Sequence, residues 1–255
     1  MRITRAVVPS LFTVLNIFSG FRSIIHTSQG DYVLAGWFII LAALFDTLDG
    51  LMARITKSSS DFGVELDSLS DVVSFGAAPS FLVYTIHLHS LAGAGMLISA
   101  MPMIFGALRL ARFNVQLIGY DKDYFKGLPI PAAAITIVAY IMAYYIYGVG
   151  LPPIASSLLA PVVVVLSLLM VSSFKYDTAP KFSRRGIKQH PLRFTVTVVG
   201  VTAIIVTRGS ALLPFFVFFV LTGPLRYFIH FIQHGFRHDE KSANEKETEI
   251  SSIDL

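Results

Sequence analysis

Eight long apolar segments follow one another along the sequence, and almost no charged residue interrupts them. An α-helix needs roughly 20 apolar residues to cross the ~30 Å hydrocarbon core of a bilayer. Charged residues make up only 14% of the chain, whereas soluble domains contain about 25%. We therefore predict an all-α, polytopic membrane helix bundle of about eight transmembrane helices, at residues 9–28, 32–52, 62–87, 91–112, 129–148, 151–173, 194–207 and 210–234.

The lysines and arginines are concentrated in alternate connections between these segments. If the N-terminus is cytoplasmic, all of them except Arg22 and Arg208 lie on the cytoplasmic side. The opposite connections, such as 88–93 and 148–153, contain no lysine, arginine or carboxylate. By the positive-inside rule, both termini are cytoplasmic, which requires an even number of spans.

The ends of the chain differ from its centre. Residues 1–237 form the predicted transmembrane domain, and the polar residues 238–255 are predicted to be a disordered cytoplasmic tail. His230, His234 and His238 share one helix face, which permits metal binding but is more typical of an interfacial belt. The basic segment 175–193 is compatible with binding of anionic lipid, although its role in membrane orientation explains it equally well. Because the chain has no cysteine, disulfides, thiolate nucleophiles and cysteine-ligated metal sites are excluded.

Four aspartates lie at the cytoplasmic ends of the second and third segments. Asp46 and Asp49 are three residues apart, and Asp67 and Asp71 are four apart, so each pair shares one helix face. A short connection joins the two segments, which places both pairs at the same depth. A carboxylate beside hydrocarbon costs a few kcal/mol, so an acid within a membrane segment indicates a function.

Four carboxylates in a site of low dielectric constant need a counter-charge. Divalent cations with oxygen ligands supply one, and Mg²⁺ is commonly held by a few carboxylates together with substrate phosphate. Two such ions about 4 Å apart are suited to a phosphoryl displacement. The residues between the pairs are compatible with a phosphate site, because they offer little bulk, a guanidinium and several hydroxyls: Gly50, Ala53, Arg54, Ser58, Ser59, Ser60 and Gly63.

The pattern Asp46-x-x-Asp49-Gly50-x-x-Ala53-Arg54, eight residues, Gly63-x-x-x-Asp67-x-x-x-Asp71 resembles the signature of the CDP-alcohol phosphotransferase family at every defined position. The resemblance implies that an acceptor hydroxyl attacks the β-phosphate of a CDP-linked lipid and that CMP leaves. It implies that Asp46, Asp49, Asp67 and Asp71 bind two Mg²⁺ or Mn²⁺ ions and that Asp71 is also the general base. The residues implied to line the CDP or lipid-binding pocket are Gly50, Ala53, Arg54, Ser60 and Gly63.

Three further motifs bear on the acceptor. They are Ser74-Phe75-Gly76-x-Ala78-Pro79-Ser80, Leu108-Arg109-Leu110-Ala111-Arg112-Phe113-Asn114 and Phe125-Lys126-Gly127-Leu128-Pro129-x-Pro131-Ala132-Ala133. Together they resemble the phosphatidylserine synthase branch of the family, which implies CDP-diacylglycerol and L-serine as substrates. Arg109 and Arg112 share a helix face, and with Asn114 they are candidates to bind the acceptor or a phosphate.

Other functions remain open from the sequence. The same chemistry could use glycerol phosphate, inositol phosphate or an amino alcohol as the acceptor. A membrane prenyltransferase also uses two acidic clusters, but the spacing through Gly50, Arg54 and Gly63 argues against it. A cation transporter is expected to place its acids near the midplane and in two related halves, which this sequence does not. We expect membrane lipids and no nucleic acid as partners, an active site facing the cytoplasm (at the cell membrane in a prokaryote), and compatibility with a homodimer.

Overall fold

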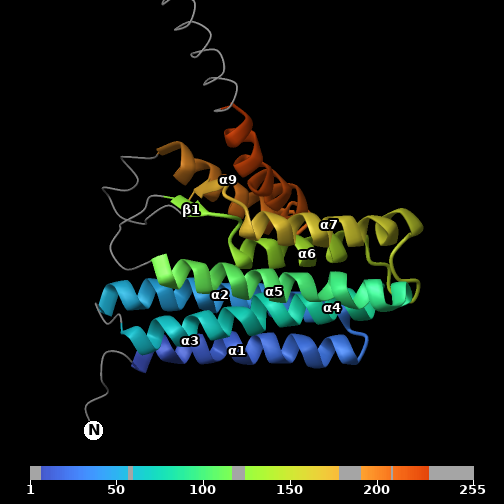
Figure 1. Cartoon of the computed structure of the whole chain (residues 1–255), viewed down its shortest axis with the longest axis horizontal. Helices are drawn as coiled ribbons and strands as arrows, with labels where there is room; N and C mark the ends of the chain where they lie inside the picture. The colour runs from blue at the N-terminus through green and yellow to red at the C-terminus, as the bar shows by residue number, and fades with distance from the viewer. Residues whose placement is uncertain (1–6, 57–59, 117–123, 178–190, 208, 230–255) are drawn as a thin grey trace, which may run out of the picture.

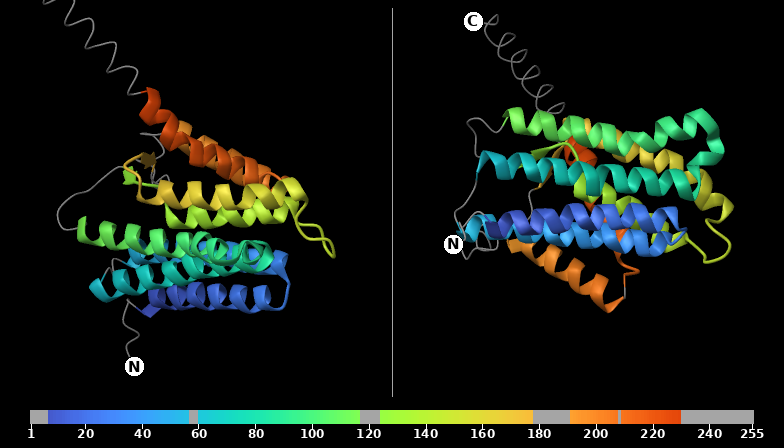
Figure 2. Two further views of the ribbon diagram at one scale, coloured as in Figure 1. Left: turned by 45° about the vertical axis from the view of Figure 1, so that its right-hand side comes forward. Right: turned by 90° about the horizontal axis from the view of Figure 1, so that it is seen from below.

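A computed structural model of the chain describes residues 7–56, 60–116, 124–177, 191–207 and 209–229. Within them, a helix occupies each of the eight predicted segments, which confirms the all-helical fold class. The helices lie side by side with their long axes nearly aligned, while the last two are inclined to the rest (Figures 1 and 2). The only strands in these residues are β1 (Tyr124–Lys126) and β2 (Lys175–Asp177), which pair antiparallel.

The first half of the chain forms the layer that holds the aspartates. Helix α1 (Val7–Ser28) packs extensively on α2 (Tyr32–Thr56), and Gly30, with a φ of +83°, makes the tight turn between them. The third segment consists of α3 (Asp61–Asp71), the π-helical turn η1 (Val72–Ala77) and α4 (Ala78–Ile86). The short 3-10 turn η2 (Leu88–Leu91) then leads into α5 (Ala92–Gln116).

The second half of the chain covers this layer. Helix α6 (Ile130–Tyr144) contacts α2 and η1, and ten of its residues are buried. Helix α7 (Pro153–Val171) packs on α5 and α6, and it is followed by β2, α9 (Pro191–Val206) and the helix Leu212–Ile229. The large apolar residues of α6 and α7 thus form much of the core, including Ile137, Ile141, Leu159 and Met170.

Five helices are long and apolar enough to cross a membrane: Tyr32–Ala53, Phe62–Ile86, Leu88–Val115, Pro153–Val171 and Leu212–Ile229. The helix Ile130–Tyr144 is apolar but shorter. The protein is thus an integral membrane protein by this criterion. The count of eight spans and the cytoplasmic side of both termini stay predictions.

The turn η1 departs from the single regular helix predicted for residues 62–87. Gly76 lies against the backbone of α5, where a Cβ on Gly76 would come within 3.1 Å of the Met103 Cα. Ser80 Oγ of α4 accepts a hydrogen bond of 3.2 Å from the Met103 amide of α5, immediately after Pro102. Proline disturbs the hydrogen bonding of a helix, and here a side chain from the neighbouring helix binds the next amide. The end of the motif that runs from Ser74 to Ser80 therefore joins α4 to α5.

Candidate active site

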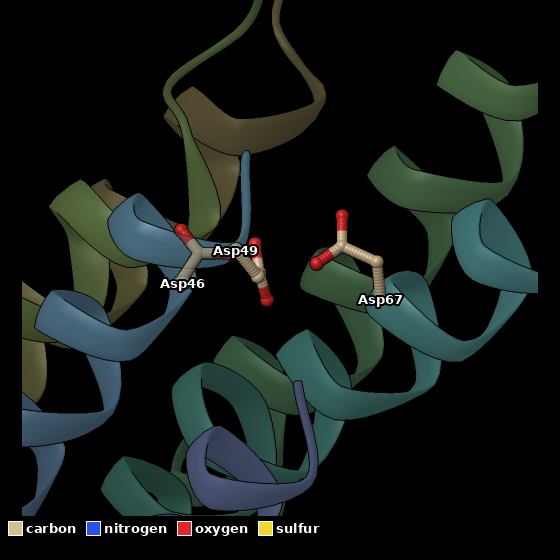
Figure 3. Close-up of side chains that lie close together, drawn as sticks. All are labelled: Asp46, Asp49 and Asp67. Atoms are coloured by element: carbon tan, nitrogen blue, oxygen red, sulfur yellow. The ribbon is translucent and has the colours of Figure 1, made fainter. Parts of the chain in front are cut away.

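The four aspartates come together between α2 and α3, as their spacing predicts. Carboxylate oxygens of Asp46, Asp49 and Asp67 all lie within 4.8 Å of one another. In Figure 3, Asp46 and Asp49 project from α2 toward Asp67 on α3. Asp49 and Asp71 are the most enclosed of the four, with 6% and 7% of their surfaces exposed. The cluster is therefore a compact group of carboxylates, in which Asp49 and Asp71 are buried while Asp46 and Asp67 remain partly exposed.

Asp71 occupies a different position from the other three carboxylates. Its carboxyl group lies close to that of Asp46. It also lies close enough to Arg109 of α5 for an electrostatic interaction, and Arg109 is itself only 6% exposed. Arg109 thus provides a buried positive charge beside the fourth aspartate, and the site extends over α2, α3 and α5.

The oxygen atoms of this site fit divalent cations. Asp49 Oδ2, Asp67 Oδ1 and Asp71 Oδ1 are buried and have no hydrogen-bond partner. A buried charged oxygen without a partner is strongly unfavourable. Divalent cations such as Mg²⁺ bind carboxylate oxygens of this kind and neutralise their charge. The residues present therefore form a suitable cation site, which agrees with the prediction of metal-binding aspartates.

Helix α1 also borders the site, although contact by Thr13 was not expected from the sequence. The Thr13 hydroxyl donates a hydrogen bond to the Asp49 carboxylate. Ser70 Oγ donates to the Thr13 carbonyl at 3.3 Å, so the same turn of α1 also binds α3. A sequence signal does exist, because buried polar residues recur every three or four positions along this apolar helix: Thr13, Asn16, Ser19, Ser23 and Thr27.

The residues predicted to line a CDP pocket follow Asp49 on α2 or lie at the start of α3. Apart from its own helix, Gly50 has no atom within 4 Å of the position that a Cβ would take, so there is open space beside its backbone. Ala53 and the backbone of Arg54 follow one turn later on α2. Ser60 is the N-cap of α3, where its Oγ accepts a hydrogen bond of 3.1 Å from the Gly63 amide. Ser60 therefore stabilises the start of the helix that bears Asp67 and Asp71.

The three predicted acceptor-binding residues have different surroundings. Only Arg109 is directed to the aspartates, by its interaction with Asp71. Arg112 Nη1 donates to the Val171 carbonyl at 3.0 Å, and its Nη2 makes contacts of 3.4 Å with the carbonyls of Lys126 and Ser172. Asn114 Nδ2 donates to Ser68 Oγ at 3.0 Å. Arg112 and Asn114 thus join the end of α5 to α7, β1 and α3.

Several predicted features lie outside the described residues. These are Ser58, Ser59, the stripe of His230, His234 and His238, the tail 238–255 and most of the basic segment 175–193.

Comparison with known proteins identifies the family. The sequence profile of the CDP-alcohol phosphatidyltransferases matches residues 6–172. The chain belongs to this family. Its relatives include the CDP-diacylglycerol–serine O-phosphatidyltransferase of Helicobacter pylori, 36% identical over 86% of this chain and 90% of that protein. The enzyme of the same name from Methanocaldococcus jannaschii is 41% identical over 66% of this chain and 72% of that protein.

A solved structure shares the fold. The phosphatidylinositol phosphate synthase of Mycobacterium tuberculosis, crystallised with CDP-DAG bound, aligns with a TM-score of 0.50 and 21% identity over 67% of this chain and 83% of that one. Members of this family use divalent metals, in agreement with the aspartate cluster. Membership of the family excludes the prenyltransferase and the cation transporter as interpretations of that cluster.

Proposed function

We propose that this protein is a CDP-diacylglycerol–serine O-phosphatidyltransferase. It transfers the phosphatidyl group of CDP-diacylglycerol to the hydroxyl of L-serine, and the products are phosphatidylserine and CMP. The observation that carries the proposal is the convergence of Asp46, Asp49 and Asp67 within 4.8 Å on the family's signature helices. The relatives named above support serine as the acceptor, since most of this chain aligns with them.

The reaction is a displacement at the lipid-side phosphorus. The serine oxygen forms a bond to that phosphorus, and the bond between the phosphorus and the oxygen of CMP breaks with its electron pair on CMP. Asp71 accepts the proton of the serine hydroxyl, a role supported by its position beside the metal-binding cluster and near Arg109. Because a carboxylate is a weak base for an alcohol, proton transfer accompanies the attack, and the positioning of the hydroxyl contributes most of its effect.

The four aspartates would hold two divalent ions, Mg²⁺ or Mn²⁺, and the carboxylate oxygens of Asp46, Asp49 and Asp67 lie within 4.8 Å of one another. When bound, such ions polarise the phosphoryl oxygens and stabilise the charge of the leaving CMP. Gly50, Ala53, Arg54, Ser60 and Gly63 line the CDP pocket. The open space beside Gly50 supports this assignment, because a nucleotide can approach the helix backbone there.

Arg109 binds the carboxylate of serine or the lipid phosphate. Its guanidinium is buried beside Asp71, where hydrogen bonds to an anionic ligand are strong because water is scarce. Arg112 and Asn114 contribute by holding the end of α5 in place, since their side chains bond to Val171 and Ser68.

We infer that the protein crosses the membrane eight times, with both termini in the cytoplasm and the active site on the cytoplasmic side. The distribution of lysine and arginine supports this orientation. Residues 1–237 then form the transmembrane domain and 238–255 a disordered cytoplasmic tail, and the protein is compatible with a homodimer.

The proposal is tested with purified protein, CDP-diacylglycerol, Mg²⁺ or Mn²⁺ and a panel of acceptors, by measuring CMP. The panel contains L-serine, glycerol phosphate, inositol phosphate and ethanolamine. We expect CMP release to depend on serine and phosphatidylserine to form in equal amount. CMP release with another acceptor but not with serine would assign the protein to a different branch, and no CMP with any acceptor would contradict the proposed chemistry.

A further inference from the structure

A fully buried asparagine on α1 lies one helical turn from Thr13, which bonds to Asp49, and neither the sequence motifs nor the proposed mechanism uses it. Asn16 of α1 has no exposed surface. Neither its Nδ2 nor its Oδ1 has a hydrogen-bond partner. Buried side-chain amides nearly always have partners, and leaving one unpaired is unfavourable. An unpaired amide at this position therefore indicates a missing ligand or partner.

The register of the helices places Asn16 at the depth of the innermost aspartate. Thr13 of α1 bonds to Asp49 of α2, and the two helices run in opposite directions. Three residues farther into the membrane on each helix are Asn16 on α1 and Asp46 on α2. Because positions three apart share a helix face, Asn16 faces the same side as Thr13, toward the cluster.

The backbone around Asn16 is fixed on its other side by η1. Ser74 Oγ donates a hydrogen bond of 2.9 Å to the Asn16 carbonyl, just as Ser70 Oγ donates to the Thr13 carbonyl. One turn later, a Cβ on Gly20 would come within 2.7 Å of the Ser74 backbone, so α1 and η1 are in close contact there. The backbone of Asn16 is therefore held close to the site.

The unpaired atoms in this region are chemically complementary to a cation centre. Besides the amide of Asn16, they include carboxylate oxygens of Asp49, Asp67 and Asp71. An amide oxygen is a hard, neutral ligand of the kind that divalent cations accept, and an amide NH₂ donates to carboxylate oxygens. A cation bound by the carboxylates would thus be a partner for the amide oxygen, and a carboxylate would accept a hydrogen bond from the amide NH₂.

We propose that Asn16 belongs to the divalent-cation centre, where its amide oxygen faces the bound ion and its NH₂ group steadies a neighbouring carboxylate. This extends the proposed function by one residue on α1, a helix outside the aspartate signature. It rests on the cation site of that function but not on the identity of the acceptor. Partners of this kind typically change metal affinity 10–100-fold when they are removed.

The test is Mn²⁺ binding, measured from the free-ion electron paramagnetic resonance signal of purified protein without serine. Titrations are made with and without CDP-diacylglycerol. Because serine is left out, no turnover occurs in either arm. Asn16→Leu removes both polar atoms at similar size, and Asn16→Asp keeps an oxygen ligand. The matched control is Ser23→Ala, since Ser23 is also buried on α1 and has an unpaired hydroxyl, two turns farther from the site.

We expect Asn16→Leu to weaken Mn²⁺ binding at least tenfold, and Asn16→Asp and Ser23→Ala to bind about as tightly as the wild type. Unchanged Mn²⁺ affinity in Asn16→Leu, or in Asn16→Ala if the leucine variant does not fold, would overturn the inference. An equal loss in Ser23→Ala would also overturn it, because the effect would then come from packing. If Asn16→Leu weakens Mn²⁺ binding but the wild type releases no CMP with any acceptor, the proposed function is contradicted and the inference on Asn16 still holds.

Discussion

Arg112 Nη1 donates a hydrogen bond of 3.0 Å to the main-chain carbonyl of Val171, which joins the end of α5 to the end of α7. Arg109, one turn earlier on α5, is directed instead to Asp71. Two arginines of one motif thus have different surroundings. Arg112 contacts the framework of the protein, whereas Arg109 lies beside the aspartate cluster, so we expect mutations of the two arginines to have separable effects.

We predict that Arg109→Ala raises the KM for serine by about 10–100-fold. The KM for CDP-diacylglycerol should rise less. A hydrogen bond to a charged group contributes about 1.5–3 kcal/mol, and each 1.4 kcal/mol is a factor of about ten. Arg112→Ala is the matched comparison, and it should leave the KM for serine nearly unchanged. Its main effect should be a melting temperature lower by about 2–4 °C for each kcal/mol of hydrogen bonding that is lost at the α7 end. Equal shifts in both KM values for Arg109→Ala would instead indicate binding of the lipid phosphate.

Asp71→Asn should abolish serine-dependent CMP release, with a fall of at least about 100-fold in kcat. The substituted amide cannot accept the proton of the serine hydroxyl, and a general base contributes about 10²–10⁴ in rate. The fold should be kept, since asparagine has nearly the same size. The measurement is CMP release together with the melting temperature, and substantial activity in a folded variant would remove Asp71 from the role of base.

Removal of divalent cations should stop turnover completely and reversibly. The unpaired oxygens of Asp49, Asp67 and Asp71 are buried together, and an ion is the simplest source of compensating charge. CMP release is measured after EDTA treatment and again after Mg²⁺ or Mn²⁺ is added, with Ca²⁺ as a comparison. Undiminished activity without metal would refute a role for cations in the reaction.

Local sequence rules predicted the helices and the aspartate pairs well. Segment 151–173 corresponds to α7 at Pro153–Val171, because a long apolar run leaves little choice of structure. The pairing of Asp46 and Asp49 with Asp67 followed from helix periodicity and a short connection. Both features depend on residues close together in the sequence.

Features that depend on distant residues were not predicted. The π-helical turn at Val72–Ala77 goes with the contact of Gly76 on Met103, and the pairing of β1 with β2 joins two connections far apart in the chain. The role of Arg112 depends in the same way on Val171. In each case the sequence contained the residues but no indication of which of them would meet.

Tyr176 of β2 offers a test of the contact between this strand and the last described helix. Its side chain is fully buried, its hydroxyl donates a hydrogen bond of 3.1 Å to the Val220 carbonyl, and its ring lies against Gly223. Burial raises the pKa of Tyr176 to about 12, whereas an unfolded tyrosine ionises near pH 10. Above about pH 10 the unfolded chain therefore loses this proton before the folded protein does, which lowers stability as the pH rises.

We predict that the melting temperature falls more between pH 9 and pH 11 in the wild type than in Tyr176→Phe, which cannot ionise there. At pH 8 the phenylalanine variant should be slightly less stable, by about 1 kcal/mol for the lost hydrogen bond. Parallel pH profiles for the two proteins would show that Tyr176 is accessible to solvent and that β2 does not hold the last helix in this way.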